Sequence, residues 1–74
     1  MTAAEALTGL SGLMLARADA DRLPADHQLR VLATAFDDAA RGYFAQPQTV
    51  PVKGFVAAWA RADVAWHDYL GEHP

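Results

Sequence analysis

Cysteine is absent from this chain of 74 residues, which excludes disulfide bonds, thiol catalysis and zinc sites built on thiolates. Isoleucine is absent too, and no stretch alternates valine and threonine for long enough to form a β-strand. A domain this short has a small core and usually needs a disulfide, a structural metal or another chain for its stability. With disulfides excluded, a metal or a partner chain is left.

Charge of one sign is not concentrated anywhere along the sequence. Six basic and nine acidic residues give a formal net charge of −3, spread evenly over the chain. There is no basic arm or stripe that would follow a phosphate backbone, so nucleic acid is not expected as a partner. The uncharged run 6–16 is too short to cross a membrane, and the Glu5 before it argues against a secretory signal. We therefore expect a cytoplasmic protein with no membrane segment and no cofactor.

Large hydrophobic side chains are few and unevenly placed. Hydrophobic residues make up 53% of the chain, but 17 of them are alanine, which leaves 22 larger side chains. No aromatic residue precedes Phe36. The core is therefore expected to lie in the segments of about residues 25–45 and 50–70, with the N-terminal segment laid across it.

Helical spacing predicts one all-α domain over residues 1–74. Apolar residues recur at intervals of three and four in three stretches, which are separated by two short connections that contain proline. No linker or tail is expected beyond residues 71–74. The predicted architecture is a three-helix bundle with short connections, able to join a larger helical assembly, and its helices cover about residues 3–18, 25–45 and 50–70.

Capping signals mark the ends of these helices. Thr2 and Glu5 have the spacing of a capping box at the start of the first helix. Pro24 suits the first turn of the second helix, because the backbone donor that it lacks would have no partner there. Thr49 is expected to cap the third helix, and Gly71 is expected to end it.

The first predicted helix carries no charge from residue 6 to residue 16. Its opposite side presents Gly9 and Gly12, and each glycine inside a helix costs about 0.8–1 kcal/mol relative to alanine. Such a helix either frays or packs on a second side. We expect Gly9, Gly12 and Leu15 to form a candidate interaction surface. The predicted inward stripe consists of Leu7, Leu10, Leu13 and Met14.

The third predicted helix carries an aromatic stripe and a smaller apolar strip on its back. On the back, Val56, Ala60 and Val64 recur at every fourth position. Surface helices seldom present such a row to water, so this strip is the second candidate interaction surface. The aromatic stripe is expected to face the core and consists of Val52, Phe55, Trp59, Trp66 and Leu70.

Asp63 is the polar residue on this aromatic side, between Trp59 and Trp66 and one turn before His67. An unpaired buried carboxylate is costly, so we expect it at the rim of the aromatic core with a hydrogen-bond partner. The alternative is a minor catalytic or metal-binding role for Asp63 with His67. No nucleophile or further ligand has a defined spacing to this pair, so we predict no catalytic residue there.

Metal ligands are otherwise sparse in the sequence. The segment with Asp19, Asp21 and Asp26 lacks the glycine and the closing glutamate of a calcium loop. His67, Asp68, Glu72 and His73 cluster near the C-terminus, but none of them has the spacing of a known metal motif. We therefore predict no metal ligand, which favours association with a protein as the source of stability.

These features predict a small non-enzymatic protein-interaction module, such as an accessory subunit, a regulator or an inhibitor. It would act by helix-mediated self-association, as a homodimer or other homo-oligomer, or by docking on a larger protein. The alternative is a small DNA-binding regulator of helix-turn-helix type. Against it, the outward side of the third helix offers only Lys53 and Arg61 beside Asp68. The connection with two prolines is also longer than the tight turn of that motif.

Overall fold

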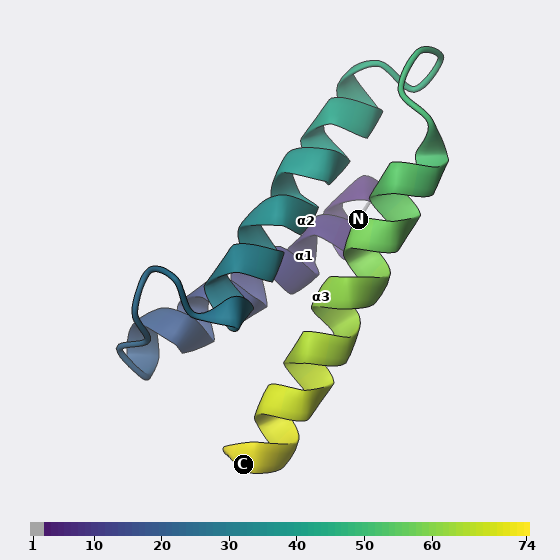
Figure 1. Ribbon diagram of the computed structural model, residues 1–74. Helices are drawn as coiled ribbons and strands as arrows, with labels where there is room; N and C mark the ends of the chain where they lie inside the picture. The colour runs from purple at the N-terminus through teal and green to yellow at the C-terminus, as the bar shows by residue number, and fades with distance from the viewer. Residues whose placement is uncertain (1–2) are drawn as a thin grey trace.

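A computed structural model describes the backbone of residues 3–74 and the side chains of residues 9–74. The predicted all-α three-helix fold is confirmed (Figure 1). No strand occurs in the described residues, and the helices are α1 (Ala3–Ala20), α2 (Gln28–Ala45) and α3 (Val52–Glu72). The proposed capping box of Thr2 and Glu5, and the side chain of Leu7, lie outside the described part of the chain.

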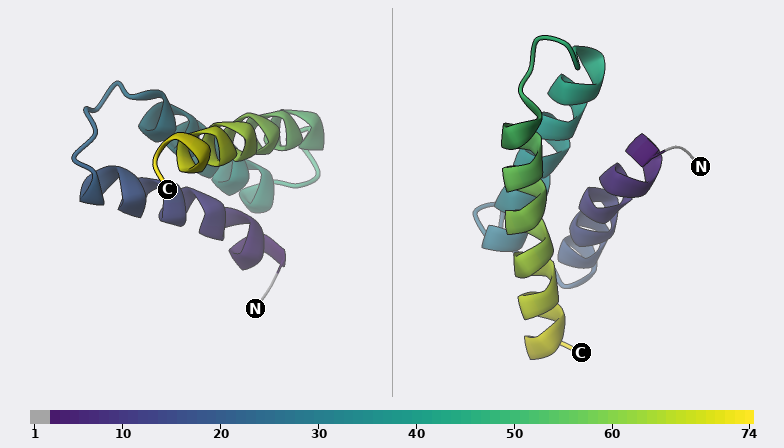
Figure 2. Two further views of the ribbon diagram at one scale, coloured as in Figure 1. Left: turned by 90° about the horizontal axis from the view of Figure 1, so that it is seen from below. Right: turned by 90° about the vertical axis from the view of Figure 1, so that its right-hand side faces the viewer.

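The helices α2 and α3 form an antiparallel hairpin, and α1 lies across one side of it (Figure 1). Both other helices pack closely against α2, whereas α1 and α3 touch each other only over a short stretch. Both views in Figure 2 show α1 leaning away from α3 toward its own N-terminus. The central element of the bundle is therefore α2.

The core is a narrow line of side chains from all three helices. The ring of Phe36, fully buried in α2, lies 5.8 Å from the ring of Phe55 between centroids, and Tyr43 stacks on Phe55 at 5.4 Å. Alanines at the crossings let the helix backbones come close together. The buried hydrophobic residues are Met14, Ala18, Leu29, Ala33, Phe36, Ala40, Phe55, Ala62 and Tyr69.

The inward side of α3 is rotated relative to the predicted aromatic stripe. Phe55 is buried as expected, but the buried line continues through Ala62 and Tyr69, each seven residues further on. Trp59 is 37% exposed and Val52 is 49% exposed, so their predicted core positions were wrong. The physical reason is that a small residue at the crossing allows α3 to approach α2, which a tryptophan on that line would prevent.

The inward side of α1 also differs from the prediction. Ser11 is buried together with Met14, and its hydroxyl donates a long hydrogen bond of 3.4 Å to Oδ1 of Asp37 in α2. Leu13, predicted to face inward, is 61% exposed. Leu15, predicted to face outward, packs partly against the core. A polar residue can take the buried position because α2 supplies its hydrogen-bond partner.

The end of α1 and the start of α2 differ from the prediction that placed Pro24 in the first turn of the second helix. Arg22 follows α1 with φ of 54°, in the left-handed region, and the N–H of Leu23 donates to the carbonyl of Ala18 at 2.9 Å. This is the Schellman arrangement that ends a helix. The next helix begins at Gln28 rather than near Pro24 because His27 caps it, its Nδ1 accepting the N–H of Leu29 at 3.1 Å.

The ends of α3 are also shifted by a residue or two. Thr49 does not cap it, because its hydroxyl donates to Oε1 of Gln46 at 3.1 Å within the connection. Pro51 occupies the N-cap position without a side-chain hydrogen bond. At the other end α3 passes through Gly71 and finishes at Glu72.

Candidate functional site

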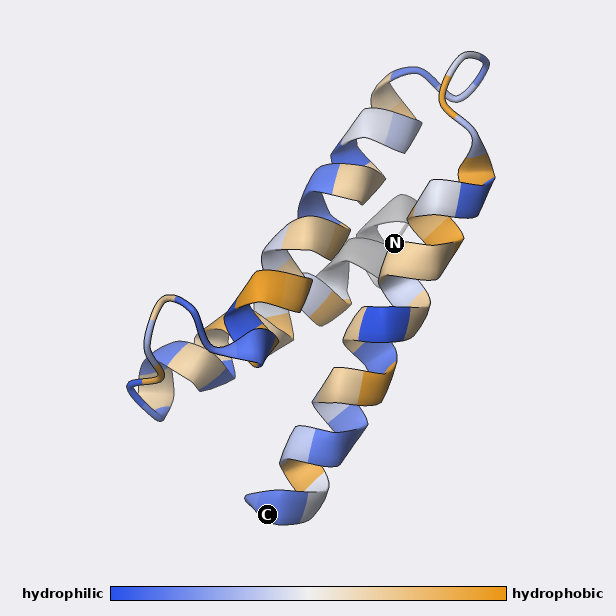
Figure 3. Cartoon of the chain, in the orientation of Figure 1, coloured by the Kyte–Doolittle hydropathy of each residue, from blue (hydrophilic) through white to orange (hydrophobic). Residues whose placement is uncertain are grey.

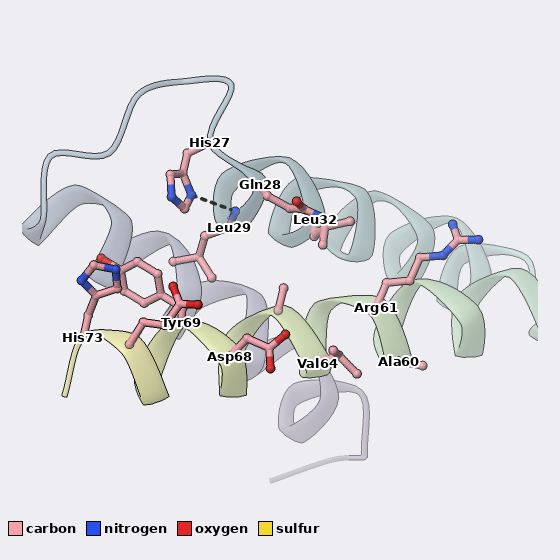
Figure 4. Close-up of a pocket in the computed structure, with 12 residues that line it drawn as sticks. His27, Gln28, Leu29, Leu32, Ala60, Arg61, Val64, Asp68, Tyr69 and His73 are labelled. Atoms are coloured by element: carbon pink, nitrogen blue, oxygen red, sulfur yellow. Dashed lines mark hydrogen bonds between the residues drawn. The ribbon is translucent and has the colours of Figure 1, made fainter.

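An open groove of about 590 Å³ runs between α2 and α3 (Figure 4). It is lined by residues of these two helices and by the flanking His27 and His73, and by no described residue of α1. We call it the α2–α3 groove. Its apolar lining consists of Leu29, Leu32, Ala60, Val64 and Ala65, and its polar lining of His27, Gln28, Arg61, Asp68, Tyr69, Glu72 and His73.

The apolar wall on the α3 side is the predicted strip on the back of that helix. Ala60 and Val64 line the groove, and Val64 is 60% exposed. Val56 continues the row one turn earlier and is 49% exposed. Hydrophobic positions recur along the whole of α3 (Figure 3). The strip is thus exposed, while its use as an interaction surface stays a prediction.

The charged rim of the groove is made by residues that do not pair within the chain. Arg61 and Asp68 lie on the same side of α3, seven residues or about two turns apart. Neither belongs to an ion pair among the described residues, and neither does Glu72. In Figure 4 the Asp68 carboxylate points into the groove, and the Arg61 side chain extends away from α3.

Tyr69 and His73 line one end of the groove and contact Arg17 and Asp21 behind it; we call these four residues the Tyr69 cluster. The Tyr69 hydroxyl donates a hydrogen bond to Oδ2 of Asp21, and Nε of Arg17 donates to the same oxygen at 2.8 Å. Nη2 of Arg17 donates to the carbonyl of His73 at 2.6 Å. The rings of Tyr69 and His73 stack at 4.4 Å between centroids. The cluster ties the end of α1 to the end of α3.

Electrostatics in the Tyr69 cluster favour its ordinary charge states. The hydrogen bond from Tyr69, followed by that from Arg17, lowers the pKa of Asp21. Because the Tyr69 hydroxyl donates this hydrogen bond to Asp21, its own pKa is raised, with a smaller contribution from burial. The carboxylate is held ionised and the phenol protonated, so neither is prepared to exchange a proton near neutral pH. The cluster therefore has the properties of a structural tie.

Asp63 and His67 lie at the surface of α3, outside the groove. The Asp63 side chain is 37% exposed, and Nδ1 of His67 lies 2.8 Å from its carbonyl and 3.4 Å from its Oδ1. Trp59, Asp63 and Trp66 stand on one side of the buried line through Ala62, and the groove residues stand on the other. The structure brings the four predicted residues to one side of α3 without forming a pocket around them.

The predicted surface on α1 is only partly exposed. Gly9 and Gly12 face open space, with no neighbouring atom within 4 Å of the position that a Cβ would take. Leu15 instead packs against the core, and Leu13 takes its place on the outside. Contacts within the chain therefore do not explain the two glycines.

The Tyr69 cluster and the charged rim were missed by the sequence analysis. Arg17 and Asp21 have the i, i+4 spacing of a helical ion pair, a signal that was available. Their contact with Tyr69, 48 residues away from Asp21, depends on the tertiary fold. Arg61 and Asp68 look like ordinary surface charges until α2 is placed beside them.

The part of the chain that the structure describes contains neither a metal-binding cluster nor a membrane-spanning helix. No group of three His, Asp or Glu side chains there is arranged to hold a metal ion. None of the helices in that part is both long enough and apolar enough to cross a membrane. Comparison with protein-family models, curated proteins and solved structures gave no match to this chain.

Proposed function

We propose that this chain is a non-enzymatic protein-interaction module that binds a helix of a protein partner in the α2–α3 groove. The observation that carries the proposal is the composition of the groove. Leu32 and Val64 contribute to an apolar lining that the described part of α1 leaves uncovered, and the charged rim forms no ion pair with any residue whose side chain the structure describes. Grooves of this kind bind the apolar face of an amphipathic helix.

The length of the groove supports a helical partner. Its lining extends along α3 from Ala60 to His73, which corresponds to about 20 Å at 1.5 Å per residue. This length accommodates about four turns of a partner helix. Such a helix can place apolar side chains against Leu32 and Val64 and leave polar side chains for the rim.

The groove is less suited to the alternative functions. A DNA-binding surface needs several cations, whereas Asp68 and Glu72 stand beside Arg61 on this face. A catalytic role for Asp63 and His67 would need a pocket around them, and neither residue lines the groove. These observations favour binding to a protein.

Site-specific photo-crosslinking tests the proposal. A benzophenone amino acid is placed at Val64, and in a matched control at Asp38, which is exposed on α2 and lies outside the groove lining. We expect the benzophenone at Val64 to form a covalent adduct with a partner in the cells that produce the protein. The cross-linked site should lie in one helical segment of that partner. The Asp38 position should not give it. The proposal fails if neither position gives an adduct, or if both give the same ones.

A further inference from the structure

We infer that the helix bound in the α2–α3 groove is α3 of a second copy of this chain, in antiparallel orientation, with Arg61 of each copy paired to Asp68 of the other. This inference rests on the proposed function, because it names the occupant of the same groove. Beyond the proposed function, the complex is a symmetric homodimer, and the register between the two α3 helices is defined.

The outward surface of α3 is complementary in charge to the same surface of a second copy. In a two-fold symmetric interface, if residue i meets residue j, then j also meets i. Arg61 and Asp68 lie on one side of α3, and neither has an ion-pair partner among the described residues of its own chain. Two copies of α3 that cross antiparallel near Val64 therefore bring Arg61 opposite Asp68 twice.

This register places no two like charges opposite each other along the groove. The remaining carboxylate of the lining is Glu72. In the register that pairs Arg61 with Asp68, Glu72 comes opposite Ala57, which carries no charge. Each copy has a formal net charge of −3. The charged lining, Arg61 with Asp68 and Glu72, carries one net negative charge per copy, so most of the charge of each copy lies outside the interface.

The outward side of α3 has small side chains at the spacing at which two helices pack together. Ala57, Ala60 and Val64 recur there at intervals of three and four, the spacing of a helix-packing seam. Small side chains allow two helix axes to come within about 8 Å. Val64, the largest of the three, is 60% exposed and lies nearest the symmetry axis of the proposed pair. It can therefore reach the apolar lining of the partner's groove.

Charge exchange tests the pairing by sedimentation velocity or light scattering of the purified full chain. We expect wild type to dimerise in a concentration-dependent manner. Arg61→Asp and Asp68→Arg should each raise the dissociation constant by tenfold or more, because each puts two like-charged pairs in contact. Arg61→Asp combined with Asp68→Arg should restore it to within about threefold of wild type, because complementarity returns.

A matched control separates the interface from the overall charge. Arg22→Asp makes the same change of net charge as Arg61→Asp, but Arg22 lies in the connection between α1 and α2, outside the groove lining and away from the seam on α3. We expect its dissociation constant to stay within about threefold of wild type. Circular dichroism of each variant should show the helical content of wild type. Single variants that dimerise like wild type, or a double variant that does not recover, would overturn the pairing.

Cysteine cross-linking tests the orientation, and the chain has no cysteine of its own to interfere. Under mild oxidation Val64→Cys should form a disulfide-linked dimer. Ala57→Cys should not, because two copies of residue 57 would be separated by about 20 Å in the antiparallel pair. Equal cross-linking at both positions would indicate a parallel pair and overturn the inferred register.

The outcomes also separate this inference from the proposed function. A wild-type chain that stays monomeric up to about 1 mM, a weak-binding limit, excludes the second copy as occupant. If the Val64 photo-crosslink then captures a different protein in cells, the proposed function stands and only the identity of the occupant is wrong. If it captures nothing, both are wrong.

Discussion

At the scale of single residues, Tyr69 is the side chain that joins the largest number of elements. Its hydroxyl binds Asp21 beyond the end of α1, and its ring stacks on His73 beyond the end of α3. The ring of His27, the cap of α2, meets it edge-on at 6.0 Å between centroids. One aromatic residue thus fixes the relative positions of three helix ends.

The bond between Asp21 and Tyr69 predicts how stability depends on pH. Asp21 has a pKa below its usual 3.8, so its contribution is present above that value and is lost as the pH falls through the lowered pKa. Tyr69 has a pKa above its usual 10.0, so its contribution is present below 10.0 and is lost as the pH rises through the raised pKa. The contribution should therefore be greatest between about pH 4 and pH 10.

The Tyr69→Phe variant tests this prediction. Urea unfolding followed by circular dichroism at several pH values should give a lower free energy of unfolding than wild type in the middle of the range. The difference should shrink at both extremes. Tyr43→Phe is the matched control, because the Tyr43 ring stacks on Phe55 while its hydroxyl makes no hydrogen bond in the described structure. A difference between wild type and Tyr69→Phe that does not change with pH would contradict the assignment.

At the scale of helices, α1 is the element whose sequence fits its structure least well. Gly9 and Gly12 are exposed inside the helix, where they reduce its stability, and no described residue requires the space that they leave. The helix is held by Met14 and Ala18 in the core and by the hydrogen bonds of Arg17. Its persistence therefore depends on tertiary contacts near its C-terminal half.

Replacement of a glycine in α1 should stabilise the fold. Gly12→Ala is expected to raise the free energy of unfolding by about 0.8–1 kcal/mol, because the position is exposed and open. Ala16→Gly, the opposite change at another exposed position of α1, should lower it by a similar amount. Both are measured by denaturant unfolding at low protein concentration. A loss of stability in Gly12→Ala would show that another backbone contacts this side of α1 in solution.

The sequence predicts the number, type and order of the helices, and it fails where packing outweighs hydrophobicity. The Trp59 ring has far more apolar surface to bury than Ala62, so a pattern of large apolar residues places Trp59 inside, whereas the close approach of α3 to α2 requires Ala62. The start of α2 was misplaced because histidine is not among the preferred capping residues, so His27 gives no strong signal.

The candidate site was predictable only in part, and for a similar reason. The spacing of Val56, Ala60 and Val64 identified an apolar strip on α3, which is exposed. The opposite wall of the groove comes from α2, where Leu32 has the helical spacing of a core residue relative to Leu29 and Phe36 and so gives no sign of a groove. A groove between two helices depends on their relative rotation, which the pattern of one sequence does not determine.

At the scale of the whole molecule, the core is thin for the size of the chain. The molecule exposes 4955 Å², whereas a compact monomer of 8.0 kDa is expected to expose about 4,450 Å². The excess agrees with the limited contact between α1 and α3 and with the open groove. Apolar surface that the fold does not bury is available for association.

Thermal stability should therefore depend on concentration. If the groove holds a second copy, association stabilises the folded chain by mass action, and a hundredfold rise in concentration across the dissociation constant should raise Tm by about 5 °C. Differential scanning calorimetry over that range measures the shift. Val64→Arg, at an exposed position of the groove, should fold at low concentration and show no dependence. A wild-type Tm that does not change would contradict self-association.

The limited contact between α1 and α3 also bears on the order in which the chain folds. Nearly all helix packing joins neighbours in sequence, α1 with α2 and α2 with α3, which is a low contact order and favours fast folding. The hairpin of α2 and α3 can form before α1 docks, and α1 can detach in a local opening event that leaves the hairpin folded. Amide protons of α1 would then exchange with solvent sooner than those of α2. Because no described residue of α1 lines the groove, its apolar lining and charged rim can be in place while α1 is still open, whereas Tyr69 and His73 would then lose their contacts with Asp21 and Arg17.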